Sequence, residues 1–189
     1  MSVDEYHRMI RAGVFDTEEK ERHELIEGWI MPKARQSPMH CYVRQFLTNF
    51  FWHRELPDGW MFSSTVTLPT ADSHPEPDGQ IVRDRWVEAV DWPRPDESAL
   101  TIEAADLTLD FDRTIKRRVY GRARIPVYWI VNIPDRQVEV YTDPTGPTDP
   151  PYAAGYNSRQ VFRDADSVPV VIRGQVIAQI PVSRLLPRV

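Results

Sequence analysis

Residues 99–105 read ALTIEAA, an apolar run interrupted by one acid, Glu103. This pattern is typical of a central strand that carries a carboxylate. A charge flanked by Ile102 and Ala104 is expensive to bury without a partner. The stretch therefore predicts a central strand whose acid serves either a functional site or a buried ion pair.

The chain after this strand predicts a helix and then a hairpin. Residues 111–123 form a strongly basic helix that Pro126 prevents from continuing. Residues 127–132 and 137–141 are predicted strands, and Pro134 followed by Asp135 suits a type I turn between them. This apolar hairpin is a candidate interface between two copies and equally a candidate for the core.

Further elements are predicted on both sides of this centre. Ser37-Pro38 opens a helix with a serine N-cap and a proline at the first helical position, and the helix runs to about residue 55. Gly28 is the hinge of a turn between two short strands within residues 23–31. The remaining predictions are a helix over residues 3–12, strands over 60–68 and near 78–82, and strand-like pieces at 160–162 and 170–180. This order predicts an α/β fold with a mixed central sheet flanked by helices.

Composition limits the class of protein. The 189 residues can bury a sizeable core and predict one domain over residues 1–189. The single cysteine, Cys41, excludes an intramolecular disulfide, favours a cytoplasmic location, and is expected to be a buried thiol. Charges throughout residues 1–22 predict no signal peptide, and no later stretch approaches ~18 uninterrupted apolar residues, so we expect no membrane span. The net charge of −5 means that nucleic acid would need a local basic patch.

Three residues form a candidate catalytic site. Asp78 lies at the start of a predicted strand, Glu103 lies within an apolar strand, and Lys116 lies on the following helix. Two carboxylates on adjacent strands can bind a hard divalent cation through oxygen. A nearby lysine could orient or deprotonate the attacking water and shield negative charge during phosphodiester hydrolysis. By spacing alone, a solvated surface triple is the alternative, because the chain has 28 acidic and 23 basic residues.

Other chemistries have little support in the sequence. The five histidines, His7, His23, His40, His53 and His74, lack the spacing of metal ligands, and His40 is expected in the first turn of its helix. The chain has neither a phosphate-binding glycine loop nor a GxSxG motif. These absences argue against nucleotide-driven enzymes and serine hydrolases.

Five segments resemble, in the same order, those of the Uma2-like restriction endonucleases, also called DUF820, a branch of the PD-(D/E)xK nuclease superfamily. The segments are His23-Glu24-Leu25-Ile26-Glu27-Gly28, Ser37-Pro38-Met39-His40, Glu76-Pro77-Asp78, Asp112-Arg113-Thr114-Ile115-Lys116 with Tyr120, and Ile125-Pro126-Val127-Tyr128-Trp129-Ile130-Val131. The resemblance covers residues 4–186. After the second acid, residues 104–109 depart from the family's usual loop, and Trp29 replaces a usual glutamate.

The resemblance implies a restriction-endonuclease-like core and a metal-dependent site. In it, Asp78 and Glu103 would hold Mg²⁺ or Mn²⁺, and the backbone carbonyl of Ala104 or Ala105 would add a ligand. Lys116 would be the catalytic lysine, displaced from the strand onto the helix. Glu24 would be a further ligand or a group that positions water, and Gln80 is a weaker candidate.

The basic helix supplies the local patch that nucleic acid would need. Its cationic residues are Arg113, Lys116, Arg117, Arg118, Arg122 and Arg124. We expect Arg113 and Arg117 to bind nucleic acid. The alternative is a solvated helix face with extended arginines.

The functional hypothesis is a divalent-metal-dependent endonuclease that hydrolyses nucleic acid, specifically DNA, as a homodimer with two symmetric sites. The alternative is a catalytically weak or inactive nucleic-acid-binding module with the same core. A third hypothesis is a glycosidase that uses the Asp78 and Glu103 carboxyls, against which the intervening Lys116 argues.

Overall fold

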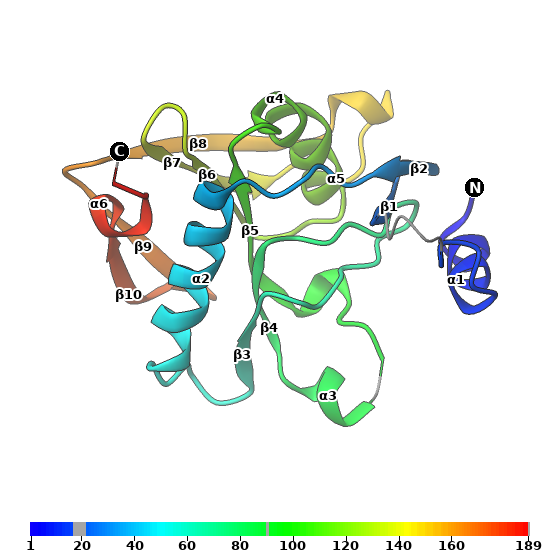
Figure 1. Cartoon of the computed structure of the whole chain (residues 1–189), viewed down its shortest axis with the longest axis horizontal. Helices are drawn as coiled ribbons and strands as arrows, with labels where there is room; N and C mark the ends of the chain where they lie inside the picture. Colours follow the sequence, from blue (N-terminus) through cyan, green and yellow to red (C-terminus); the bar gives the residue numbers. More distant parts are fainter. Residues whose placement is uncertain (17–21, 90, 189) are drawn as a thin grey trace.

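The computed structural model describes residues 1–16, 22–89 and 91–188 and has a six-stranded sheet at its centre (Figure 1). The strands, in their order across the sheet, are β3 (Trp60–Ser63), β4 (Gly79–Arg83), β5 (Ser98–Ala105), β6 (Val127–Asn132), β7 (Gln137–Pro144) and β8 (Tyr156–Arg163). β5 and β6 run parallel, and the other neighbouring pairs run antiparallel. The predicted α/β fold with a mixed central sheet is therefore confirmed.

The parallel pair β5–β6 requires a crossover connection, and this connection is helical. It consists of α4 (Leu109–Phe111), a π-helical turn (Asp112–Lys116) and α5 (Arg117–Arg122), where the sequence predicts one helix over residues 111–123. The π turn buries its first and last side chains, Asp112 and Lys116. Such turns within helices occur frequently at functional sites.

Helices cover both faces of the sheet (Figure 1). α2 (Pro38–Trp52) packs on one face through its buried residues Val43, Leu47 and Phe51, as the predicted helical spacing requires. The same core cluster includes residues of a hairpin formed by β9 (Ser167–Ile172) and β10 (Gln175–Pro181), and of α6 (Val182–Leu185).

The crossover covers the other face of the sheet, where Tyr120 of α5 packs against Tyr128 of β6. Along β5, Ile102 and Ala104 belong to the cluster beneath α2, whereas Ala105 belongs to the cluster beneath the crossover. Because side chains alternate along a strand, Glu103 faces the crossover with Ala105. The alternation of β5 thus directs its one acid toward Lys116.

The N-terminal part lies beside this sheet (Figure 1). α1 (Val3–Arg11) begins at Ser2, which forms a capping box with Glu5. β1 (His23–Ile26) and β2 (Trp29–Pro32) pair around the predicted turn, where Gly28 has a φ of +79°. The other short elements are α3 (Arg85–Ala89) and two 3-10 turns, Pro95–Glu97 and Pro151–Ala153. Among the described residues, none of the helices has the length and apolarity to cross a membrane.

Two predicted strands end differently in the structure. The strand expected over residues 60–68 stops at Ser63, because the Ser63 hydroxyl accepts hydrogen bonds from the backbone N–H groups of Thr65 and Val66 and turns the chain. The piece expected over residues 170–180 is a hairpin with a turn at Arg173-Gly174, both with positive φ.

Two further expectations are settled by burial. The hairpin of β6 and β7 is core, since every residue of β6 is buried at the centre of the sheet. The prediction of a buried thiol at Cys41 is wrong, because the side chain is exposed. Cys41 lies two positions before Val43, and that spacing places it on the opposite side of α2 from the buried stripe.

Candidate active site

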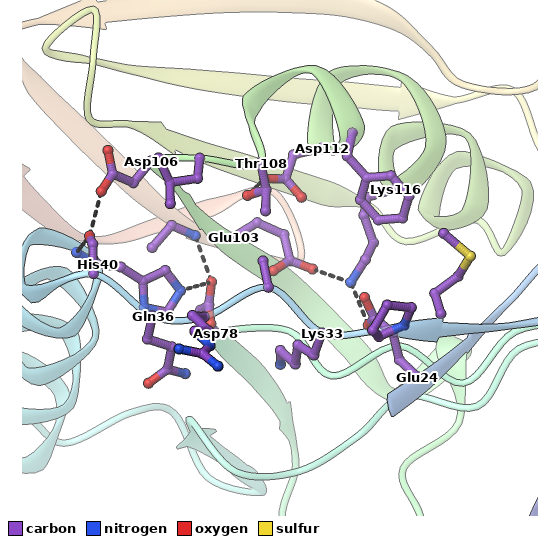
Figure 2. Close-up of a pocket in the computed structure, with 18 residues that line it drawn as sticks. Glu24, Lys33, Gln36, His40, Asp78, Glu103, Asp106, Thr108, Asp112 and Lys116 are labelled. Atoms are coloured by element: carbon purple, nitrogen blue, oxygen red, sulfur yellow. Dashed lines mark hydrogen bonds and ion pairs between the residues drawn. The ribbon is translucent and has the colours of Figure 1, made fainter. Parts of the chain in front are cut away.

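One pocket near the carboxyl end of β5 is lined by acidic and basic side chains from separate parts of the chain, and we call it the acidic pocket (Figure 2). All four predicted catalytic residues, Asp78, Glu103, Lys116 and Glu24, line this pocket. Asp78 lies directly before β4, and the others come from β5, from the crossover and from β1. His40, Asp106 and Asp112 also line it.

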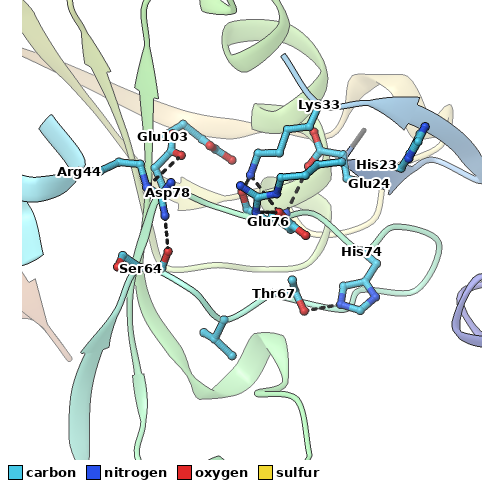
Figure 3. A network of polar contacts seen from close by, with 12 residues as sticks. His23, Glu24, Lys33, Arg44, Ser64, Thr67, His74, Glu76, Asp78 and Glu103 are labelled. Carbon is cyan, nitrogen blue, oxygen red and sulfur yellow. Dashed lines mark hydrogen bonds and ion pairs between the residues drawn. The ribbon is translucent and has the colours of Figure 1, made fainter. Parts of the chain in front are cut away.

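Asp78 is fixed by groups from both neighbouring elements. Its backbone N–H donates to Ile102 O at 3.0 Å, and its Oδ2 accepts from the Ala104 N–H at 2.8 Å. The same oxygen lies 3.0 Å from Nε2 of His40, while Oδ1 lies 3.7 Å from Nε of Arg44 (Figures 2 and 3). Burial raises the pKa of Asp78, but the hydrogen bond and charge of His40 outweigh it and hold the pKa below its ordinary value.

Glu103 is buried and uses one carboxylate oxygen for its internal contacts. Oε1 accepts from the hydroxyl of Tyr120 at 2.6 Å and from Nζ of Lys116 at 3.1 Å. Oε2 makes no hydrogen bond within the described residues. Burial raises the pKa of Glu103 to about 7, although the charge of Lys116 opposes this shift.

Lys116 bridges two acids. Its Nζ donates to Oε2 of Glu24 at 2.8 Å and to Oε1 of Glu103, and its side chain is only 4% exposed. Burial lowers the pKa of Lys116, but the negative charges of Glu103 and Glu24 more than offset this and raise the pKa above its ordinary value. An ammonium that stays protonated at neutral pH can orient groups and stabilise negative charge, whereas it cannot take a proton from water.

Glu24 is held by the loop before β4 as well as by Lys116. Its Oε2 accepts from the backbone N–H of Glu76 at 3.2 Å. Glu76 in turn pairs with Arg22, and its backbone carbonyl accepts from Nζ of Lys33 at 2.7 Å (Figure 3). Glu24 therefore lies at the wall of the pocket in a network that fixes β1 against this loop.

Sequence reasoning missed several side chains of the pocket, and His40 and Asp112 are two of them. His40 lies in the first turn of α2 as predicted, but its contact with Asp78 crosses 38 residues of sequence. Asp112 is buried and accepts from the hydroxyl of Thr108 at 2.6 Å; burial, aided by the charge of Glu103, raises its pKa. Both residues occur in segments that resemble the nuclease family, and this was the available signal.

The carboxylates suit a hard divalent cation by their chemistry. Within the described residues, Glu103 Oε2 makes no hydrogen bond, and the ion-pair partner of Asp78 Oδ1 is Arg44, at 3.7 Å. Of the two backbone carbonyls suggested as ligands, that of Ala105 accepts from the Ile133 N–H at 3.0 Å, whereas Ala104 lines the pocket. Across the described ranges, three or more acids, histidines or cysteines are nowhere gathered as a metal site. Asp78 and Glu103 thus offer hard carboxylate oxygens, and Mg²⁺ is commonly bound through one or two carboxylates.

The other predicted residues lie outside the acidic pocket. Gln80 is buried and donates from Nε2 to Val66 O at 2.7 Å, so it fixes the segment after β3. Arg113 is engaged with Glu139, with its Nε 3.0 Å from Oε1, and with Asp135. Arg117 forms no ion pair within the described residues.

Comparison with known proteins identifies the family of the chain and a structure with a similar fold. The fold resembles that of a structure described as a "putative nuclease belonging to DUF820 from Anabaena variabilis ATCC 29413", with 15% sequence identity, a TM-score of 0.67, and coverage of 98% of this chain and 97% of that one. No curated protein matches the sequence. Residues 3–179 match the Uma2 family model, described as "Putative restriction endonuclease". The chain therefore belongs to the Uma2 family of restriction-endonuclease-like proteins.

Proposed function

We propose that this protein is a divalent-metal-dependent endonuclease that hydrolyses phosphodiester bonds in DNA. The observation that supports it most is the convergence of Asp78, Glu103 and Lys116 in one pocket, from three separate elements. Family membership and the similar fold are consistent with this assignment.

Asp78, Glu103 and the carbonyl of Ala104 would hold Mg²⁺ or Mn²⁺ in the acidic pocket. A bound divalent ion would supply Lewis acidity and lower the pKa of water. The chain's own residues perform the positioning. His40 and the Ala104 N–H orient the Asp78 carboxylate, and Tyr120 fixes one oxygen of Glu103 so that the other can face the ion.

Lys116 supplies positive charge beside the reacting phosphate. Because its pKa is raised, it remains an ammonium and stabilises the negative charge that develops on the phosphate oxygens. Glu24 holds this ammonium from the other side and orients it. In this scheme Lys116 acts as an electrostatic group and not as the base.

We expect cleavage of duplex DNA by a homodimer, because two symmetric sites can cut two strands, and we expect a cytoplasmic protein. Size-exclusion chromatography with light scattering tests the dimer. A monomer that nevertheless nicks plasmid would separate the catalytic proposal from the oligomeric one.

Plasmid nicking tests the activity. Supercoiled DNA and a single-stranded oligonucleotide are incubated with the protein in Mg²⁺, Mn²⁺ or EDTA. Wild type should cleave only with metal, Asp78→Asn should not cleave, and the control Asp110→Asn should behave as wild type because Asp110 is exposed on α4. Binding of DNA in EDTA without cleavage in either metal would instead support the alternative of a nucleic-acid-binding module.

A further inference from the structure

α5 packs beside the strands β7 and β8. Residues of the crossover and of these two strands line a second concave surface. Its lining includes Arg113, Arg117, Tyr141, Asn157, Ser158 and Arg159, and we call it the arginine groove. It shares no lining residue with the acidic pocket. Arg113 and Arg117 are four positions apart on the crossover, whereas Lys116, the neighbour of Arg117, points into the acidic pocket. Adjacent residues of a helix project about 100° apart, so one helical segment serves both surfaces.

The charge of this groove is only partly neutralised. All charged side chains that line it are arginines. Glu139 lies beneath the groove, fully buried, and pairs with Arg113 and with Arg159, whose Nη2 lies 3.0 Å away. Arg117 has no ion pair within the described residues, and its guanidinium lies 5.9 Å from the centre of the Tyr141 ring. One guanidinium charge is therefore left without a counter-ion.

Arg117 also carries an unsatisfied donor. Its Nε is buried and makes no hydrogen bond to any described residue. A buried donor without a partner is unfavourable. An anion that reached the guanidinium would relieve the charge and draw this side chain into a satisfied geometry.

The loop that contains Gly146 and Gly155 packs closely against α5 beside Arg117. Gly121 and Gly155 approach so closely that a side-chain carbon on Gly121 would overlap the Gly155 backbone. Two backbone hydrogen bonds, from Gly146 to Gly121 at 3.1 Å and from Thr145 to Gly155 at 2.9 Å, fix this loop on α5. A side-chain carbon at Gly155 would lie 3.5 Å from the Arg117 guanidinium, so the loop forms one wall beside it.

The floor of the groove adds hydrogen-bonding groups on an edge strand. β8 is the last strand of the six-stranded sheet, and its residues Asn157, Ser158 and Arg159 are exposed. Guanidinium, amide and hydroxyl groups in an open groove are the donors that contact phosphate oxygens of nucleic acid.

We propose that the arginine groove binds backbone phosphates of the DNA substrate at a distance from the phosphate that is cleaved. Arg117 and Arg159 are the phosphate ligands, and Arg113 is a positioning residue that holds Glu139 beneath them. This inference rests on the proposed function for the identity of the substrate. The proposed function concerns cleavage in the acidic pocket, whereas this inference assigns part of the affinity for DNA to a separate surface.

Binding in EDTA separates the two proposals, because DNA is then not cleaved. The dissociation constant of a fluorescent duplex of about 30 base pairs is measured by anisotropy at several salt concentrations. Each phosphate contact contributes about 0.9 to the slope of log affinity against log salt. Arg117→Ala and Arg159→Ala should each lower that slope by about 0.9, which corresponds to about a 3.5-fold smaller loss of affinity between ~50 and ~200 mM salt.

Two further variants make the test specific. Arg117→Lys keeps the charge and should retain the salt slope while binding more weakly than wild type, because lysine lacks the planar fork of arginine. Arg11→Ala, which removes an exposed arginine from α1, should bind as wild type. Thermal unfolding of each variant establishes that it is folded.

The outcomes are distinguishable. If both Arg117→Ala and Arg159→Ala bind DNA with the affinity and the salt slope of wild type, phosphate binding in the arginine groove is refuted, whether or not wild type cleaves DNA in Mg²⁺. Tighter binding of a poly-aspartate peptide than of DNA would also overturn it, in favour of a protein partner. Weakened binding in these variants, with no cleavage by wild type, would support the groove and refute the endonuclease.

Discussion

Replacing Lys116 by methionine tests whether the lysine holds its neighbours by charge or only by packing. Its Nζ lies 2.8 Å from Glu24 and 3.1 Å from Glu103, and both carboxylates are buried. Methionine has a similar length and no charge. Removing one partner from a buried ion pair costs about 3–5 kcal/mol, and we expect a loss of unfolding free energy in that range at about pH 8.

The pH dependence of this loss identifies its cause. Burial raises the pKa of Glu103 from 4.5 to about 7, against the opposing charge of Lys116. A carboxyl whose pKa is raised by folding stabilises the folded state below its unfolded pKa and loses this contribution as the pH rises through its folded pKa, by about 1.4 kcal/mol per pH unit. In wild type the loss ends near pH 7. In Lys116→Met the pKa rises further, so the loss continues above pH 7 and the difference between the proteins widens by about 1 kcal/mol per pH unit.

Urea unfolding followed by circular dichroism at a series of pH values between about 6 and 8.5 measures this difference. Arg35→Met is the matched control, because Arg35 lines the same pocket but is exposed and forms no ion pair with Glu103 within the described residues. Its stability curve should remain parallel to that of wild type. If the curve of Lys116→Met is parallel as well, the lysine does not hold Glu103 in its ionised form and the electrostatic reasoning fails.

Three further predictions concern single contacts. Tyr120→Phe removes the 2.6 Å hydrogen bond to Glu103 and should lower the unfolding free energy by about 1–2 kcal/mol and reduce the cleavage rate; unchanged urea curves would contradict it. Burial raises the pKa of Glu139, but hydrogen bonds from Arg113, Tyr141 and Asn132 outweigh it and lower the pKa from 4.5 to about 2. As the pH falls from about 4.5 to about 2, wild type should therefore lose about 2 kcal/mol of unfolding free energy, a figure reduced because the paired arginines are partly exposed. Acid titration of Glu139→Gln should not show this loss. Mn²⁺ at about 100 times its dissociation constant should stabilise wild type by about 2.7 kcal/mol and Asp78→Asn much less, as measured by thermal unfolding.

The sequence was sufficient to predict residues whose environment is local. The single acid in an apolar strand identified Glu103, and the alternation of β5 then fixed the face it occupies. Lys116 was a candidate from its place on the following helix, and its contact with Glu103 follows from the crossover that any parallel pair of strands requires. The resemblance to the nuclease family added Glu24, which Lys116 also contacts.

Residues whose partners are distant in sequence could not be predicted in this way. His40 lies 38 residues before Asp78 in the sequence, and apart from its place in a family-like segment the start of α2 gives no sign of their contact. The length of β3 depended on the Ser63 hydroxyl, which competes with the sheet for two backbone donors. Cys41 lies close to the apolar stripe in sequence, but the rotation of the helix places it outside.

The acidic pocket carries charge that the fold alone would not favour. Glu24, Asp78, Glu103 and Asp112 are all buried there, and Lys116 is the fully buried cation among them. Burial raises the pKa values of Glu103 and Asp112, so each carboxylate is costly in the absence of a further cation. Apolar side chains of similar volume at these positions would give the folded state equal or greater stability. The fold instead supplies His40, Tyr120 and a backbone N–H to hold the acids in place. Under the proposed function, a divalent ion would bind there more strongly the more of these carboxylates remain ionised.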